Sequence, residues 1–572
     1  GAATLIGGLF QGNNSAANGG GLFASNTLAL TGTQFISNTA SNFGCGAIAI
    51  QASILDGGVF QNNTSTRGGG LYASTNLALM GMQFISNTAL FGGGAFANSA
   101  AMLNGGLFQT NRATGSFGAG GLYVFGALTL TGTQFLGNTA GGDGGGAATG
   151  GAAKLIGGLF QNNTSAANGG GLYAGTTLVL TETQFISNTT SSFGGGALAI
   201  DAVTLNGGQF ISNTSASKGG GLYANTSLAL TGTQFISNTS GFGGGALARR
   251  AATLNGGLFQ NNLGMSGGGM YAESTLGLTG TQFFSNSANL GSGGGAYVAG
   301  ATTLDGGLFI GNAGTDGGGL YAVLTLTLTG TQFLGNTALD DGGGALAGGR
   351  ATLNGGRFQD NNATTDISFG SGGGGLYASA LFALTGTQFI NNTARQGGGL
   401  YHAGNAGLVV NALFARNFAS SGGLGAGLYL DSPGAVQILH TTIASSTVSG
   451  GSAVHVSQGT VFLTNTLIAN HAIGIARAGG AVSDWNTLFS GVTNLYTGAV
   501  TSAGGITGTA GFVNPTADDY HLGPGSSAID AGVNAGITVD FEGAPRPIGA
   551  GFDIGYDESD RPPRAWLPLL QR

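Results

Sequence analysis

The stretch Gly169-Gly-Gly-Leu-Tyr-Ala-Gly-Thr-Thr-Leu178-Val-Leu-Thr-Glu-Thr-Gln184-Phe-Ile-Ser-Asn188 decides the fold. It holds three short strand-like pieces: Gly-Gly-Gly-Leu-Tyr-Ala, Leu-Val-Leu-Thr and Gln-Phe-Ile-Ser-Asn. Gly, Thr, Ser and Asn, which favour turns, separate these pieces. No 3.6-residue period of useful length is present. The stretch therefore predicts three strands and no helix.

The same pattern recurs along most of the chain. A Phe is followed three residues later by an Asn at seventeen places between Phe10 and Asn417, about every 25 residues. The units alternate in kind, one ending Leu-Thr-Gly-Thr-Gln-Phe and the next Leu-Asn-Gly-Gly-Leu-Phe. The repeat predicts an all-β parallel β-helix (solenoid) of about 20 coils, with three short strands and about 25 residues per coil, stacked at about 4.8 Å.

Stacked coils place like residues above one another, so the repeat predicts internal ladders. One ladder is of Phe and one is of Asn, whose amides would bond to the next coil or to turn backbone. The Gly triplets would allow positive φ and close approach of neighbouring coils. The first members of the two structural ladders are Phe10, Phe35, Phe60, Phe84, Phe108, Asn13, Asn38, Asn63, Asn87 and Asn111.

Composition excludes several function classes. Gly accounts for 119 of 572 residues, charged residues for 6%, and the formal net charge is −7. With two lysines and no basic cluster, we expect no binding to nucleic acid or anionic membranes. No run approaches the roughly 18 apolar residues of a spanning helix, so we expect no transmembrane helix. The single Cys45 excludes an intramolecular disulfide.

The pattern divides the chain into four parts. Residues 1–430 carry the regular repeats, and residues 431–504 carry irregular coils in which the motif decays. Residues 505–560 hold many of the acids and prolines, and we expect them to cap the last coil, because an uncapped coil exposes unpaired backbone. Residues 561–572 form a tail, a candidate donor strand or anchor.

The paired motifs carry a resemblance. The Phe-x-x-Asn repeats, with Gly-Gly-Ala-Leu variants such as Gly195–Leu198, look like the repeats of the chlamydial polymorphic membrane proteins. The segment Asp519–Gly532, followed by Pro545-Arg-Pro and Asp553–Asp557, resembles the closing segment of secreted bacterial right-handed β-helix proteins of the anchor-bearing kind. The resemblance implies a right-handed coil and an exported, surface-associated protein. The chain departs from the chlamydial family because no membrane barrel follows.

A row of aromatic residues on alternate coils is a candidate interaction stripe. Leu and Ala flank each Tyr at two-residue spacing, so if they point inward the Tyr points outward. A long exposed apolar stripe would be an interaction surface. The alternative is that the parity is reversed and the rings line the core. The stripe consists of Tyr72, Tyr123, Tyr173, Tyr223, Tyr271 and Tyr321.

Catalytic and metal sites are weakly indicated. Polysaccharide cleavage needs clustered carboxylates, whereas the acids of residues 1–430 are mostly isolated, Asp340-Asp341 being the one adjacent pair. We therefore expect no enzyme, no catalytic residue and no cofactor. The acidic closing segment leaves calcium binding open, since Ca²⁺ prefers oxygen ligands.

The chain begins in mid-coil, which leads us to expect head-to-tail assembly. A short apolar segment near the end would add as a strand to the open first coil of the next molecule. We expect an extracellular structural or adhesive protein of a bacterial surface that self-assembles into a filament. The alternative is a carbohydrate-binding or carbohydrate-cleaving β-helix. The candidate assembly residues are Ala565, Trp566, Leu567, Leu569 and Leu570.

Overall fold

A computed structural model describes residues 1–364, 372–502 and 504–559. The chain is an all-β parallel solenoid of about 19 turns with about 25 residues per turn, as predicted. It forms two compact units: unit 1 comprises Gly1–Gly277 and Thr281–Asn289, and unit 2 comprises Leu278–Gly280 and the residues from Leu290 onward. No helix in the described part of the chain is long and apolar enough to cross a membrane.

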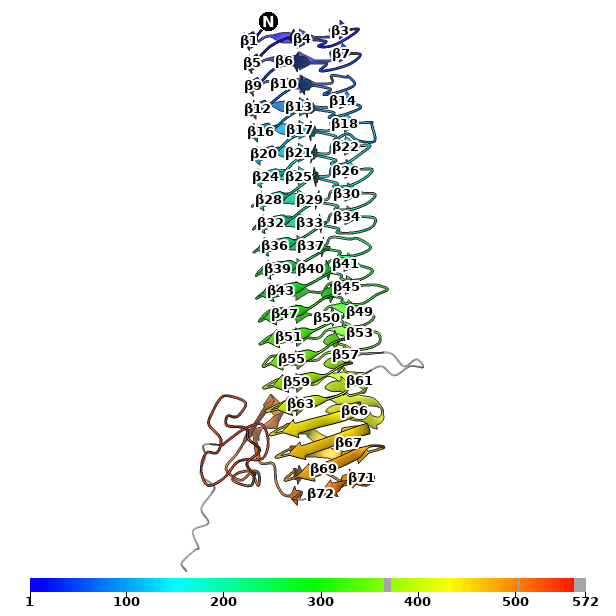
Figure 1. Ribbon diagram of the computed structural model, residues 1–572, viewed down its shortest axis with the longest axis vertical. Helices are drawn as coiled ribbons and strands as arrows, with labels where there is room; N and C mark the ends of the chain where they lie inside the picture. The colour runs from blue at the N-terminus through cyan, green and yellow to red at the C-terminus, as the bar shows by residue number, and fades with distance from the viewer. Residues whose placement is uncertain (365–371, 503, 560–572) are drawn as a thin grey trace, which may run out of the picture. The chain divides into compact units, whose positions relative to one another are not determined.

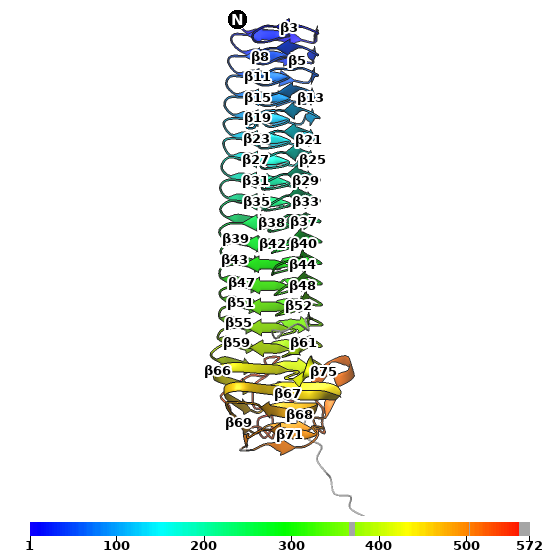
Figure 2. The ribbon, with the colours of Figure 1, turned by 90° about the vertical axis from the view of Figure 1, so that its right-hand side faces the viewer.

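Most regular turns of unit 1 contain four short strands. β27 (Leu172–Ala174), β28 (Leu178–Thr181) and β29 (Gln184–Ile186) are the three predicted pieces. A fourth strand of two residues, β30 (Thr189–Thr190), follows the Asn, and it is too short for the sequence pattern to reveal. The strands pair in parallel with their counterparts in β31 (Ala197–Ala199), β32 (Val203–Asn206), β33 (Gln209–Ile211) and β34 (Thr214–Ser215), one turn on (Figures 1 and 2).

The Phe ladder fills the core of each unit. Phe185 is fully buried, and its ring stacks on Phe160 and Phe210 with centroids 4.8 Å apart. In unit 1 the stack begins at Phe10, Phe35, Phe60, Phe84 and Phe108 and continues to Phe283. Stacking of identical rings at the coil spacing fixes the register, because a slip by one residue would turn each Phe outward.

The Asn ladder lies at the turn after the Phe strand. Ser187 has a φ of 55°, which turns the chain and directs the Asn188 side chain inward. Asn188 Nδ2 donates to the Phe160 carbonyl at 2.8 Å and to Asn213 Oδ1 at 2.9 Å. Asn188 Oδ1 accepts the backbone N–H and the Nδ2 of Asn163. Each internal Asn repeats this pattern, so the amides satisfy groups that the turn buries.

The Gly triplets have a steric cause. A Cβ built on Gly195 would lie 2.2 Å from the carbonyl oxygen of Gly220 in the next turn, and one on Gly196 would lie 2.6 Å from that of Gly221. No side chain fits between backbones at this distance. The preceding Gly194 has a φ of 69°, the left-handed conformation that favours Gly.

Unit 2 begins with the same turns and then changes. The Phe ladder continues to Phe414 in β64 (Leu413–Ala415), after which the strands lengthen. β66 (Leu428–Leu439), β67 (Thr442–Thr464) and β68 (Leu467–Arg477) each span what were several strands in the earlier turns. These longer strands correspond to the region in which the sequence motif decays.

The closing segment packs beside these turns, and the contacts of residues 512–556 are to the lateral face of the coils. Tyr520 in β75 (Asp519–Leu522), Ile554 and Tyr556 share an apolar cluster with Leu413, Leu467 and Leu488, which lie in the Phe-strand column. Asn411, Asn465 and Asn486 donate to the carbonyls of Val539, Val533 and Ala531. We expected this segment to cover the end of the last coil. These residues instead cover the side of the late coils, because the late coils present apolar side chains on that face.

Candidate binding surface

The predicted Tyr stripe lies on the strand that follows each Gly triplet. In β35 (Leu222–Ala224), Leu222 and Ala224 are fully buried, whereas Tyr223 belongs to a separate apolar cluster with Leu198 and Leu247. Tyr72 forms a similar cluster with Ile48 and Phe96. The ring row is therefore distinct from the Phe ladder of the core.

The rings are less exposed than a bare stripe would be. Tyr72 is 7% exposed and Tyr223 is 6% exposed, which differs from the expected open surface at these two positions. The remaining four, Tyr123, Tyr173, Tyr271 and Tyr321, are half-buried.

The cover comes from the residue just before the Gly triplet. Phe193, Lys218 and Phe242 hold this place on successive turns and are joined by backbone bridges. Phe193 stacks on Tyr223 with centroids 5.2 Å apart, and Lys218 Nζ lies 6.0 Å from the Phe242 ring centroid. This covering column was missed, although alternation of an aromatic with a basic residue before Gly-Gly-Gly is visible in the sequence.

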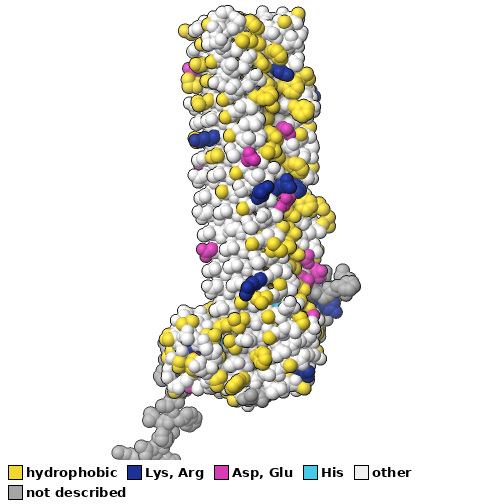
Figure 3. Space-filling model, viewed as in Figure 1, with side chains coloured by type: hydrophobic (Ala, Val, Ile, Leu, Met, Phe, Trp, Pro, Cys, Tyr) yellow, Lys and Arg dark blue, Asp and Glu magenta, His cyan; other side chains and the backbone are white. Residues whose placement is uncertain are grey.

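An earlier part of unit 1 repeats the arrangement. The Arg67 guanidinium lies 5.4 Å from the Phe43 centroid and 5.6 Å from the Phe91 centroid. Cation–π contacts of this kind hold a charge on a charge-poor surface. Figure 3 shows hydrophobic side chains gathered along this edge of the coils, with basic and acidic side chains among them.

A charged cluster borders the row in unit 1. Glu273 pairs with Lys218 Nζ at 2.8 Å and with Arg249 Nε at 3.1 Å. Burial raises the pKa of Glu273, but the bonds to Lys218 and Arg249 outweigh it and lower the pKa overall. Asn225 Oδ1 accepts from Arg249 and from the Tyr223 hydroxyl. A hollow of about 390 Å³ beside this cluster is lined by Tyr173, Phe193, Lys218 and Arg249, among others.

From Tyr377 onward the ring row of unit 2 is a continuous stack. Tyr377, Tyr401, Tyr429 and His455 follow one another with centroids 5.0, 4.9 and 4.8 Å apart and nearly parallel planes. The ring faces are occupied by one another, so only edges and hydroxyls remain for a ligand along this stretch.

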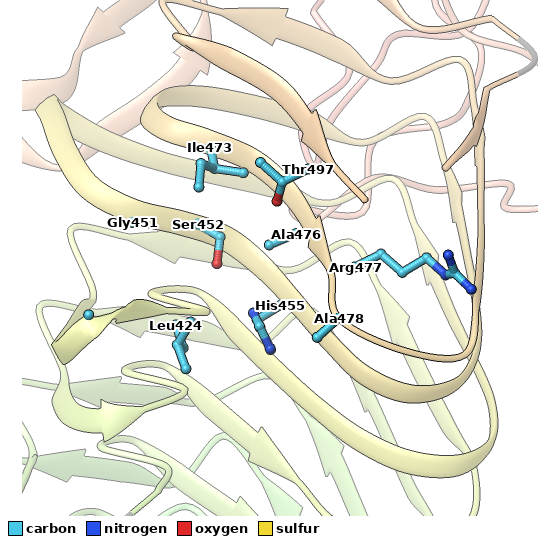
Figure 4. A pocket seen from close by; sticks show the side chains of 10 residues that line it. Leu424, Gly451, Ser452, His455, Ile473, Ala476, Arg477, Ala478 and Thr497 are labelled. Atoms are coloured by element: carbon cyan, nitrogen blue, oxygen red, sulfur yellow. The ribbon is translucent and has the colours of Figure 1, made fainter. Parts of the chain in front are cut away.

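The stack ends at His455, which lines a cavity of about 210 Å³ (Figure 4). The next turn carries Ala476 at the equivalent register, and the small residues Gly451, Ala476 and Ala478 leave the space open. Ile473, Arg477 and Thr497 form further walls. The cavity occupies the place where a further ring of the stack would lie.

Three carboxylates also gather in unit 2. Asp316, Asp340 and Asp341 place oxygens within 4.8 Å of one another on neighbouring turns. Burial raises the pKa of Asp341 to about 7, with further contributions from Asp340 and Asp316, although the Gly372 N–H bond lowers it. The sequence indicates the adjacent pair but not Asp316, which lies a turn away.

The acidic closing segment uses its carboxylates mainly for its own backbone. Asp540 accepts from the N–H groups of Glu542, Ala544 and Glu558. Glu558 forms a fully buried ion pair with Arg546 at 2.6 Å. These bonds account for the acid content of the segment as a structural feature.

In the closing segment, the residues that could hold a calcium ion are His521, Glu542 and Asp557, whose ligand atoms lie close together. His521 Nδ1 lies 2.6 Å from Asp519, and Nε2 lies 3.1 Å from Glu542. Burial lowers the pKa of His521, but the bond to Asp519 and the nearby charges of Asp557 and Glu542 outweigh it and raise the pKa overall. The imidazole nitrogens already contact Asp519 and Glu542, and Ca²⁺ prefers oxygen ligands, so these residues do not fit the ion well.

The predicted ladder residues all lie on the two ladders, with Phe10 and Asn13 in the first turn less buried than the rest. The candidate assembly residues Ala565, Trp566, Leu567, Leu569 and Leu570 lie outside the described residues. Comparison with known proteins found no matching family model and no matching curated protein.

Proposed function

We propose that the chain is an extracellular structural and adhesive solenoid of a bacterial surface, with the aromatic row and its covering column as the contact surface. The observation that carries this proposal is that the polar side chains fall into two groups with different places in the turn. The Asn amides are used within the ladder, whereas Lys218, Arg249 and Glu273 are placed beside the aromatic row. Aromatic residues and Arg are enriched at protein interfaces, and the rims of these interfaces are polar.

Export, surface attachment and filament formation belong to the same proposal. The resemblance of the repeats and of the closing segment to bacterial surface β-helix proteins supports the location. The chemistry of Ala565–Leu570, apolar and proline-containing, supports head-to-tail addition of this segment to another copy. Electron microscopy of the purified chain at several concentrations tests assembly: filaments support it, and dispersed particles at every concentration contradict it.

Adhesion is tested with beads coated with the protein and presented to bacterial and plant polysaccharides. The double variant Lys218→Gln/Arg249→Gln removes the cations beside the row. Lys154→Gln, on the outward side of β24 (Ala153–Ile156), is the matched control. We expect retention of the beads to fall in the double variant and not in the control. Equal retention of all three proteins at background level would contradict adhesion.

Carbohydrate cleavage is a second candidate, favoured by Asp316, Asp340 and Asp341. Retaining glycosidases place two carboxyl groups about 5 Å apart, one of them protonated. The raised pKa of Asp341 and its closeness to Asp316 fit these roles of acid and nucleophile. Reducing-end assays on a polysaccharide panel, with Asp341→Asn as control, test this candidate. Product formation abolished by the substitution would support it, and absence of products would contradict it.

A further inference from the structure

The aromatic stack of unit 2 stops at a vacant ring position. Tyr401, Tyr429 and His455 occupy equivalent places on successive turns, and Ala476 follows at the next one. One face of the His455 ring lies on Tyr429, and the cavity of about 210 Å³ lies beside the imidazole. This volume is about that of seven water molecules in the liquid, enough for one six-membered ring.

His455 also presents an unsatisfied polar atom. The residue is 93% buried, since only 7% of its surface is exposed, and its Nδ1 has no hydrogen-bond partner. Burial lowers the pKa of His455, which keeps the imidazole neutral, although the charge of Asp431 opposes this effect. A buried acceptor or donor without a partner is costly, so a ligand that bonds to it gains affinity.

The other walls offer mixed chemistry. Ile473 and Ala476 are apolar, whereas Arg477 and Thr497 carry hydrogen-bonding groups. The Arg477 Nε donates to the Gly480 carbonyl at 2.7 Å, and in Figure 4 its guanidinium points away from the other labelled side chains. A fitting ligand therefore has a flat apolar ring face and hydroxyl groups at its rim.

We infer that this cavity is a saccharide subsite that accepts one pyranose ring, continuing the stack on His455 and bonding to Nδ1. The inference rests on the proposed adhesive function and gives that surface a ligand class. A phenolic or phenyl side chain of a partner protein would fill the ring position, but a pyranose also supplies several rim hydroxyls for Nδ1 and Thr497. A single ring gives a dissociation constant in the millimolar range, which suits adhesion through many weak contacts.

The test is saturation-transfer NMR of the full chain with methyl glycosides of glucose, galactose and N-acetylglucosamine. Ala476→Tyr fills the cavity with a ring of the chain itself, as Tyr401 and Tyr429 do on the earlier turns. We expect this variant to lose saccharide binding without a lower melting temperature. His455→Tyr keeps a ring face but removes Nδ1, and we expect about tenfold weaker binding. Leu346→Tyr is the matched control, because Leu346 interrupts the same row between Tyr321 and Tyr377 and is remote from the cavity.

Two outcomes overturn the inference. The first is saccharide binding that is the same in Ala476→Tyr as in the unmodified chain. The second is a panel in which no glycoside binds, or in which N-acetyltyrosinamide binds and the glycosides do not. Bead adhesion of the unmodified chain separates the two proposals. If the beads adhere but no glycoside binds in the cavity, the subsite alone is rejected. If glycosides bind in the cavity but the beads do not adhere, the adhesive function is rejected.

Discussion

Replacing Asn188 by Ala tests whether the Asn ladder holds the coils together. Asn188 makes four hydrogen bonds through its side chain: two donated, to Phe160 and Asn213, and two accepted, from Asn163. Each such bond contributes about 1 kcal/mol net, so the loss is about 4 kcal/mol, with the buried partners left unsatisfied. Asn13→Ala is the matched control, because exposed Asn13 donates one side-chain bond, to Asn38. We expect the control to lose less than about 1 kcal/mol.

Hydrogen exchange suits this measurement because solenoids can open in parts, so a single unfolding free energy is not defined. The relevant amides are those of Asn163, Asn188 and Asn213 and of the β-strands beside them. A loss of about 4 kcal/mol corresponds to roughly 1000-fold faster exchange from the locally open state. If Asn188→Ala and Asn13→Ala accelerate exchange near their own sites by similar small factors, the ladder does not carry the stability assigned to it.

Three further predictions concern steric fit and pH. Gly195→Ala should destabilise unit 1 because its Cβ would meet the Gly220 carbonyl, whereas Gly277→Ala, with nothing within 4 Å, should be neutral or slightly stabilising in thermal melts. Asp341 keeps its proton up to about pH 7 in the folded chain but only up to about pH 4 in the unfolded chain. The stability of unit 2 should therefore fall as the pH rises from 4 to 7. Asp341→Asn should flatten that dependence in denaturant titrations. The raised pKa of His521 means that its ion pairs stabilise the fold fully below about pH 6.5 and that this contribution is lost as pH rises through the folded pKa; His521→Gln should remove this step.

The architecture could be predicted because each turn repeats the same core and turn residues at the same positions. The Phe at one position predicts a stack, and the Asn three residues later predicts an amide ladder, since identical residues in register bond to their own copies. The two-residue strand β30 could not be predicted, because a pair such as Thr189-Thr190 has no periodicity. The lateral packing of Tyr520 and Ile554 was also beyond the sequence, since it joins segments far apart in the chain.

The candidate binding surface was predicted less completely. The alternation of Leu, Tyr and Ala separates the ring row from the core, but burial of Tyr223 depends on Phe193, which lies 30 residues earlier in the chain. The cluster of Asp316 with Asp341 likewise depends on turn stacking. The cavity at His455 exists because the next turn carries Ala476 where earlier turns carry a ring. This can be recognised only when the register of Ala476 is known.

Regularity itself constrains where function can lie. A side chain inside the ladders has copies above and below it, so a change there disturbs two neighbours and the hydrogen bonds of Asn163, Asn188 and Asn213 together. A side chain in the covering column, such as Lys218, touches neighbouring turns mainly through contacts with a ring or an opposite charge. This place varies among residues that include Phe, Lys, Arg, Asp, Asn, Ser and Gln. Variation is therefore tolerated along the covering column and is opposed where the coils hold one another. That asymmetry favours the aromatic edge over the core ladders as the place to find a ligand.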